Sequence, residues 1–141
     1  MKEIVRLTDL EIKVMNILWE YDTALTIQEI SGKLEKENIS MPSVKQCIRY
    51  LLAKKAVRVC ESVLVGTVYA RTFRPCFSQE EFLMSEYMRL QKSVYGGKKK
   101  NLASIVVAMM CNNEENDVSM DEVERLQAYI DEKKKQINKK K

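Results

Sequence analysis

The chain has 141 residues, 45% of them hydrophobic and 31% charged, and a formal net charge of +4. This composition is ordinary for a globular protein of one or two small domains, and the four glycines and two prolines favour helices over a β-rich fold. No stretch approaches about 18 apolar residues, and the start of the chain has no apolar signal segment, so we expect a cytoplasmic protein without membrane contact.

The sequence has few of the motifs that indicate catalysis or metal binding, and its many carboxylates fall at helix caps and on polar faces. The sequence has no histidine, and its four cysteines are widely spaced without a C-x-x-C pair. It also has no glycine motif for phosphate or dinucleotide binding, so we expect no enzyme, no cofactor and no metal. Cys47 falls on an apolar helix face and is predicted to be buried, whereas a redox or metal-sensing role stays open for Cys60, Cys76 and Cys111.

Five short stretches mark the starts of predicted helices. Four share the order apolar residue, Ser or Thr, two variable positions, Glu and a second apolar residue. In this capping-box pattern the hydroxyl accepts from the third helical N–H, and the Glu side chain accepts from the N–H of the cap residue. The fifth stretch, ISMPSV at residues 39–44, has Ser43 where the others have the glutamate. The predicted boxes are Thr8/Glu11, Thr26/Glu29, Ser78/Glu81 and Ser119/Glu122.

The first three predicted helices have apolar residues at helical spacing. They run over Thr8–Tyr21, over Thr26–Lys36, and from the ISMPSV stretch to about Lys55. The third has the clearest apolar stripe, formed by Val44, Cys47, Ile48 and Leu51. Its opposite face carries Gln46, Arg49 and Ala53, flanked by Lys45 and Tyr50.

The pattern then changes from helix to strand. Residues 57–75 are rich in Val, Thr, Tyr and Phe around Gly66, which predicts two strands joined by a turn. Three helices followed by a hairpin form a winged helix-turn-helix. Further helices are predicted over Ser78–Tyr95, Leu102–Cys111 and Ser119–Ile137. We therefore expect a mainly α protein with a small β-hairpin, with a winged-helix DNA-binding domain at residues 1–76 and a helical dimerisation domain at residues 77–141.

The C-terminal helices are too apolar for a short isolated segment. The stretch NLASIVVAMMC (101–111) is apolar nearly all round, and the last helix has apolar residues at roughly heptad spacing. These features favour a homodimer, although the helices could instead fold back on the first domain. The closing KKKQINKKK is expected to be a solvated tail, with a weak phosphate-contacting role as the alternative. The candidate dimerisation residues are Leu102, Ile105, Val106, Met109, Val123, Leu126 and Ile130.

Positive charge is concentrated on the third helix. Residues 8–37 contain seven acids and three bases, whereas residues 42–60 contain five bases and no acid. In a helix-turn-helix the second helix of the motif enters the major groove of DNA with its N-terminal residues at the base edges. A glutamate at this helix start would repel DNA, and Ser43 removes that repulsion. Chance loss of the acid, with Ser40 alone sufficing as the cap, is the alternative.

This interpretation assigns roles to eight residues, with double-stranded DNA as the partner. Gln suits adenine and Arg suits guanine in the major groove. Arg49→Ala is expected to relax specificity, and Lys54→Ala to weaken all DNA sequences alike. The alternative is a winged-helix module whose basic helix binds an acidic protein. The candidates are Ser43, Gln46 and Arg49 for bases, and Lys45, Tyr50, Lys54, Lys55 and Arg58 for phosphates.

From about Leu7 to Glu132 the chain resembles the penicillinase repressor family. The resemblance rests on the order and spacing of five features: LTDLEIKVMNILWE, SVKQCIRYLLAKK, FRPCFSQEEF, the Gly96-Gly97 pair and VSMDEVERLQAYI. Such proteins are dimeric winged-helix repressors that bind a palindromic operator. The resemblance thus implies DNA binding through an inverted repeat and dimerisation through the C-terminal helices.

The sequence departs from the family pattern in several places. Tyr50 stands where the family commonly has arginine. Lys55 stands where the family commonly has glycine, which predicts a different exit from the third helix. The wing tip VLVGTV has no basic residue to contact phosphate. Some members are inactivated by a signalling protease that cleaves an Asn-Phe bond, but the matching stretch here is Ala108-Met109. Copper-responsive members carry paired C-x-C motifs, which this sequence does not have, so the resemblance leaves the inducing factor unidentified.

Overall fold

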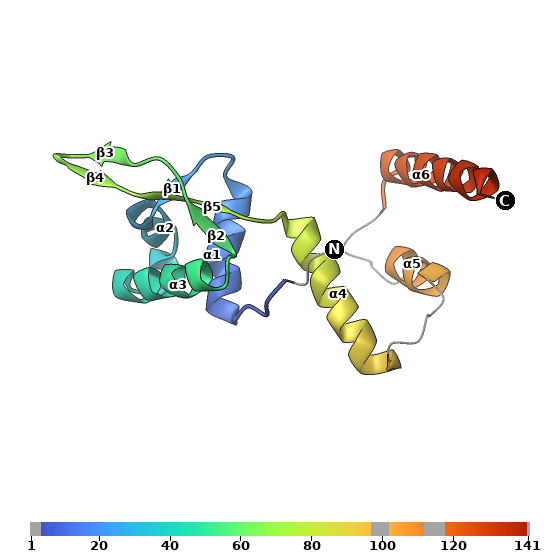
Figure 1. The fold of residues 1–141 in the computed structure, drawn as a ribbon, viewed down its shortest axis with the longest axis horizontal. Helices are drawn as coiled ribbons and strands as arrows, with labels where there is room; N and C mark the ends of the chain where they lie inside the picture. Colours follow the sequence, from blue (N-terminus) through green and yellow to red (C-terminus); the bar gives the residue numbers. More distant parts are fainter. Residues whose placement is uncertain (1–3, 97–101, 112–117, 141) are drawn as a thin grey trace. The chain divides into compact units, whose positions relative to one another are not determined.

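The computed structural model describes residues 4–96, 102–111 and 118–140, and for Leu102 only the backbone. Its contacts form two compact units, Met1–Gly97 and Lys98–Lys141. The first unit contains α1 (Asp9–Glu20), α2 (Ile27–Lys33), the 3-10 turn η1 (Glu35–Glu37), α3 (Met41–Ala53) and α4 (Gln79–Tyr95) (Figure 1). The second contains α5 (Leu102–Cys111) and α6 (Met120–Lys139). Helices and a small antiparallel sheet make up a winged helix-turn-helix, as predicted.

The predicted helix starts are observed at all five positions. Thr8, Thr26 and Ser78 form complete capping boxes with Glu11, Glu29 and Glu81, and each hydroxyl accepts the expected N–H. At α6 only half of the box is present: Ser119 accepts from the N–H of Glu122, without the reciprocal bond. Local hydrogen bonding therefore fixes where α1, α2, α3, α4 and α6 begin.

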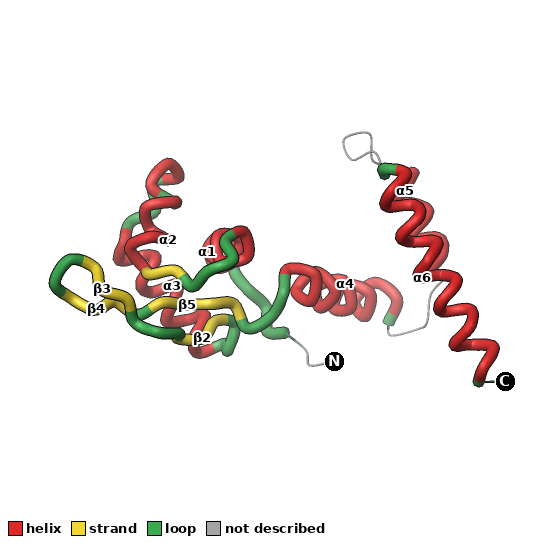
Figure 2. The backbone as a smooth tube through the Cα atoms, turned by 90° about the horizontal axis from the view of Figure 1, so that it is seen from above, coloured by secondary structure: helices red, strands yellow, loops and turns green. Residues whose placement is uncertain are grey.

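The predicted hairpin is present, in two parts (Figure 2). At its base β2 (Val57–Val59) pairs antiparallel with β5 (Thr72–Pro75), and the short β1 (Leu25–Thr26) pairs with the other edge of β5. At its tip β3 (Val63–Val65) pairs with β4 (Val68–Ala70). The β1 strand was missed from the sequence because two residues are too few to show a period.

A β-bulge separates the base of the hairpin from its tip. Cys60 donates its N–H to the carbonyl of Thr72, and Val63 pairs with Ala70, so Glu61 and Ser62 oppose the single residue Arg71. An extra residue on one strand bends the ladder and increases its twist. The tip turns at Gly66, whose φ of 66° is favourable for glycine at the first position of a two-residue hairpin loop.

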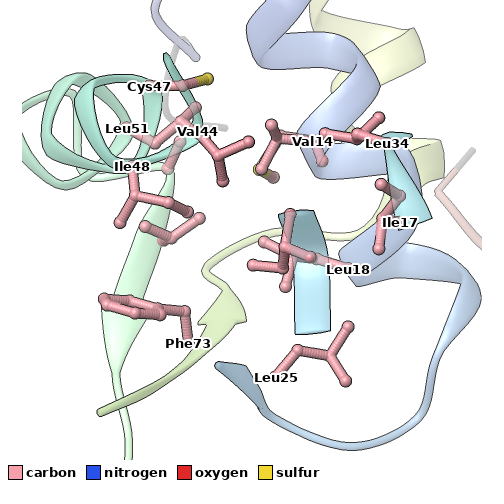
Figure 3. Close-up of a cluster of buried hydrophobic side chains, with 14 residues drawn as sticks. Val14, Ile17, Leu18, Leu25, Leu34, Val44, Cys47, Ile48, Leu51 and Phe73 are labelled. Carbon is pink, nitrogen blue, oxygen red and sulfur yellow. The ribbon is translucent and has the colours of Figure 1, made fainter. Parts of the chain in front are cut away.

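One hydrophobic core joins the three N-terminal helices to the sheet. Val14, Ile17 and Leu18 of α1 meet the predicted apolar stripe of α3, and Phe73 packs from β5 with no exposed surface (Figure 3). Cys47 lies inside this cluster, as predicted, and burial raises the pKa of its thiol to about 11, with the negative charge of Glu11 adding to the shift. Its thiol is therefore protonated and unreactive at neutral pH.

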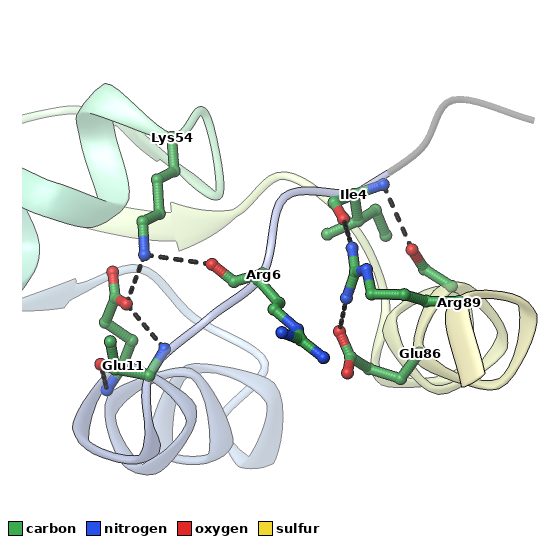
Figure 4. A network of polar contacts seen from close by, with 8 residues as sticks. Ile4, Arg6, Glu11, Lys54, Glu86 and Arg89 are labelled. Carbon is green, nitrogen blue, oxygen red and sulfur yellow. Dashed lines mark hydrogen bonds and ion pairs between the residues drawn. The ribbon is translucent and has the colours of Figure 1, made fainter. Parts of the chain in front are cut away.

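Helix α4 belongs to the first unit by its contacts. Its Ser85 hydroxyl accepts the N–H of Ile4 at 3.2 Å, and its Arg89 donates to the carbonyl of Ile4 and pairs with Glu86 (Figure 4). The rings of Phe77 and Phe82 lie 6.2 Å and 5.6 Å from the ring of Trp19 in α1. The contact boundary therefore falls after α4, whereas the division of functions between residues 76 and 77 stays a prediction.

The exit from α3 uses a left-handed residue that is not glycine. Lys55 has a φ of 60° and donates to the carbonyl of Leu52, while Ala56 donates to the carbonyl of Leu51 at 2.8 Å. This pair of bonds is a Schellman motif, in which the left-handed position usually holds glycine. The expectation that Lys55 gives a different helix exit is wrong, because the lysine adopts the conformation that glycine would adopt.

Lys55→Gly is therefore expected to stabilise the protein. Glycine removes the Cβ strain of the left-handed conformation, partly offset by its larger entropy loss, so the free energy of unfolding should rise by about 0.5–1 kcal/mol. Urea denaturation measures the change. Lys55→Ala removes the same charge but keeps the Cβ, so an equal gain in both variants would show that charge, not strain, is responsible.

The second unit exposes apolar side chains in the single chain. On α5, Val106 and Met109 are exposed and Ile105 is half-buried; on α6, Val123, Leu126 and Ile130 are exposed. Met109 and Leu126 also line one pocket of about 340 Å³ between α5 and α6. These two candidates are thus brought together, whereas the side chain of Leu102 lies outside the described residues.

Candidate nucleic-acid interface

Helix α3 divides into a buried and a polar face. Val44, Cys47, Ile48 and Leu51 are buried against the core, whereas Lys45, Gln46, Arg49 and Tyr50 are exposed. The helix has no acidic residue in its first turn, unlike α1, α2, α4 and α6. An exposed basic face at a helix whose N–H groups point outward attracts anions.

The start of α3 shows what replaces the missing glutamate. The Ser40 hydroxyl accepts the N–H of Ser43 at 3.4 Å, and the hydroxyls of Ser40 and Ser43 lie 2.9 Å apart in a hydrogen bond. A pair of neutral hydroxyls thus stands where α1, α2, α4 and α6 have a carboxylate. The helix start is capped without the negative charge that would oppose a phosphate or a base edge.

Two of the predicted site residues contact each other on the exposed face. The Gln46 side chain donates to the Tyr50 hydroxyl at 2.9 Å. This bond restrains the Gln46 amide and leaves its carbonyl oxygen free to accept. Arg49 lies beside them. Neither Arg49 nor Lys45 makes an ion pair with the described residues.

Lys54 points elsewhere. Its ammonium group lies 2.6 Å from a carboxylate oxygen of Glu11 and donates to the carbonyl of Arg6 at 3.1 Å (Figure 4). The Glu11 side chain is only 2% exposed and that of Lys54 is 27% exposed. Burial would raise the pKa of Glu11, but the hydrogen bonds from Lys54 and Thr8 outweigh it and hold the pKa below its ordinary value of 4.5. This lysine ties the end of α3 to α1 and to the N-terminal segment.

Arg58 lies on β2 and not on α3. It lines a pocket with Trp19, Arg74 and Phe77, and none of the exposed side chains of α3 lines that pocket. The sequence grouped Arg58 with the α3 bases because the two are close in the chain. Pairing of β2 with β5 places Arg58 directly opposite Arg74.

The wing tip is apolar on both of its faces. Leu64 and Tyr69 pair across the strands and are 61% and 72% exposed, while Val63, Val65 and Val68 are also exposed. The nearest charged residues in the sequence are Glu61 and Arg71, which belong to the bulge itself. The tip therefore presents apolar surface and has no charged side chain that could form an ion pair with phosphate.

The comparison with protein families decides the class of the chain. A family model described as penicillinase repressor matches residues 7–132. The chain belongs to the penicillinase repressor family. The match covers α1 through most of α6, and so includes the winged helix and the C-terminal helices. No curated protein matches the sequence.

Membership of the penicillinase repressor family agrees with the site described above. It makes the chain a transcriptional regulator of the repressor class, in a family of regulators rather than enzymes. Among the helices of residues 4–96, 102–111 and 118–140, none combines the length and apolar character needed to span a membrane.

Proposed function

We propose that this penicillinase repressor family member is a homodimeric transcriptional repressor that binds a palindromic operator through α3. The observation that carries the proposal is the polar face of α3, which is exposed, basic and free of acids from its first residue. A helix with these properties, held against a rigid core beside a wing, suits the major groove.

The proposed roles follow from where the side chains lie. Ser43, Gln46 and Arg49 contact base edges, with Gln46 oriented by Tyr50. Lys45, Lys55 and the Tyr50 hydroxyl contact phosphates and fix the register. Lys54 and Arg58 are not in this set, because Lys54 neutralises Glu11 and Arg58 lines a separate pocket.

Dimerisation would use the exposed apolar residues of α5 and α6. A two-fold dimer predicts an inverted repeat whose half-sites lie one helical turn, or a multiple of it, apart. The proposed seam contains Ile105, Val106 and Met109 of α5, with Leu102, and Val123, Leu126 and Ile130 of α6.

The proposal is tested by titrating the protein against the DNA upstream of its own gene and against a scrambled duplex at the same salt. A preference of about a thousandfold or more supports a specific operator, and footprinting then gives the half-site spacing. Equal, weak binding to both duplexes would mean either that the operator lies elsewhere or that the basic helix binds an acidic protein partner. The apolar wing tip, which offers no charge to phosphate, is the observation that favours this second function.

Arg49→Ala is expected to weaken operator binding by about 1–3 kcal/mol and to relax specificity at one base pair, because a bidentate contact to guanine is lost. Affinity for scrambled DNA should change much less. Lys45→Ala is the matched control on the same helix: it should weaken both duplexes alike and lower the salt dependence by about one ion. Equal losses on both duplexes for Arg49→Ala would contradict base reading by this residue.

A further inference from the structure

A second polar site lies where α1, the base of the sheet and α4 meet. The chain passes from β5 directly into α4 at this point (Figure 1). A pocket of about 360 Å³ opens there, within the size range of small-molecule sites. Its lining includes Trp19, Asp22, Arg58, Arg74, Phe77 and Glu81.

Two arginines face each other across the strands in this pocket. Arg58 of β2 and Arg74 of β5 are directly paired in the ladder, so their side chains share one face of the sheet. Neither guanidinium makes a hydrogen bond or ion pair with the described residues. Like charges opposite each other destabilise a sheet. An anion between them would remove this repulsion and fill both forks.

The acids that line the pocket leave the arginines available. The Glu81 carboxylate accepts the N–H of Ser78 at 3.2 Å and faces the positive end of α4. Asp22 lines the pocket but forms no ion pair with either arginine. The Cys76 thiol adds no charge, because desolvation raises its pKa, against the opposing effect of Arg58.

The remaining wall is aromatic and already satisfied in its hydrogen bonds. The indole N–H of Trp19 donates to the carbonyl of Phe77 at 2.9 Å, so the ring presents apolar surface to the pocket. Pro75 and Leu18 extend this surface. A ligand that fits both walls has a negative group at one end and an apolar ring at the other.

We propose that this pocket binds a small organic carboxylate with an apolar or aromatic body. The carboxylate lies between Arg58 and Arg74, and the body lies against Trp19 and Phe77. The site is independent of DNA binding by α3, so it stands or fails separately from the proposed repressor function.

Trp19 makes the proposal directly measurable, because it is the only tryptophan of the chain and lines the pocket. Sodium phenylacetate is titrated into the full-length protein at constant ionic strength while tryptophan fluorescence is recorded. A saturable change with a dissociation constant of about 1 mM or lower is expected. Phenylacetamide, a neutral molecule of the same shape, should bind at least about tenfold more weakly. No saturation by about 20 mM phenylacetate, or equal binding of the amide, would overturn the proposal.

Substitutions in the pocket test whether the carboxylate binds between Arg58 and Arg74. Arg58→Gln and Arg74→Gln should each weaken phenylacetate binding by about tenfold or more, whereas Asp22→Asn should leave it unchanged or tighter. Thermal melts guard against misfolding: each Gln variant should melt no lower than the wild type without ligand, because a like-charge pair has been removed. Phenylacetate should raise the melting temperature of the wild type only. An unchanged affinity in both Gln variants would exclude the arginine pair as the site.

Discussion

Ile130→Asp is expected to raise the dissociation constant of the proposed dimer by about a hundredfold or more. Ile130 is 49% exposed in the single chain and lies on the apolar line of α6 with Val123 and Leu126. In a two-fold seam the substitution places two carboxylates where two apolar side chains would be buried. Loss of the burial and desolvation of the charges together amount to about 3 kcal/mol or more.

Operator affinity should fall when the dimer dissociates. A dimer binds the second half-site at high effective concentration, and a monomer loses that advantage, so binding should weaken by about a hundredfold or more. Analytical ultracentrifugation over a dilution series gives the dimer constant, and a DNA titration gives the affinity. Binding to scrambled DNA should change less.

Ala128→Asp is the matched control for Ile130→Asp. It adds the same charge to the same helix, but two residues at about 100° each place it on the opposite side, and it is exposed. Its dimer constant should stay within about threefold of the wild type. If Ile130→Asp dimerises as tightly as Ala128→Asp and the wild type, α6 is not the dimer interface. The apolar surface of α5 then becomes the remaining candidate.

The helix starts and the fold class were predictable because their causes are local. A hydroxyl and a glutamate three residues apart make their capping bonds within one turn, so Thr8, Thr26 and Ser78 could be assigned from sequence alone. The apolar stripe of α3 likewise predicted which of its residues are buried. Both signals are confined to a few consecutive residues.

The roles of individual lysines and arginines were less predictable because their partners are distant in sequence. Lys54 and Glu11 are 43 residues apart, and nothing in the basic run at the end of α3 separates Lys54 from Lys55. Arg58 and Arg74 become neighbours only through the register of β2 and β5. The left-handed backbone of Lys55 is set by the turn into β2 and carries no sequence signal when glycine is absent.

Lys54→Met is expected to lower the free energy of unfolding by about 2–3 kcal/mol. The substitution keeps the apolar part of the side chain but leaves the buried Glu11 carboxylate without its ion-pair partner. Breaking a buried pair costs about 3–5 kcal/mol, and the partial exposure of Lys54 reduces this figure. Operator affinity and its salt dependence should stay within about threefold of the wild type at temperatures where the variant is folded. Lys45→Met, on the same helix but exposed, should instead weaken operator binding and leave the free energy of unfolding nearly unchanged.

The pH dependence and a double-mutant cycle identify the pair as the cause. Because the folded pKa of Glu11 lies below 4.5, its stabilising effect is fully present above that pH and is lost as the pH falls through the lower folded value. The stability difference between wild type and Glu11→Gln should therefore be constant from about pH 6 to pH 8 and shrink below about pH 4.5.

The double variant Glu11→Gln/Lys54→Met should lose at least about 1 kcal/mol less than the sum of the single losses, because the two side chains interact directly. Additive losses would mean that Lys54 stabilises the protein through its bond to the Arg6 carbonyl alone, and a uniform loss of DNA affinity in Lys54→Met would return this lysine to the phosphate contacts.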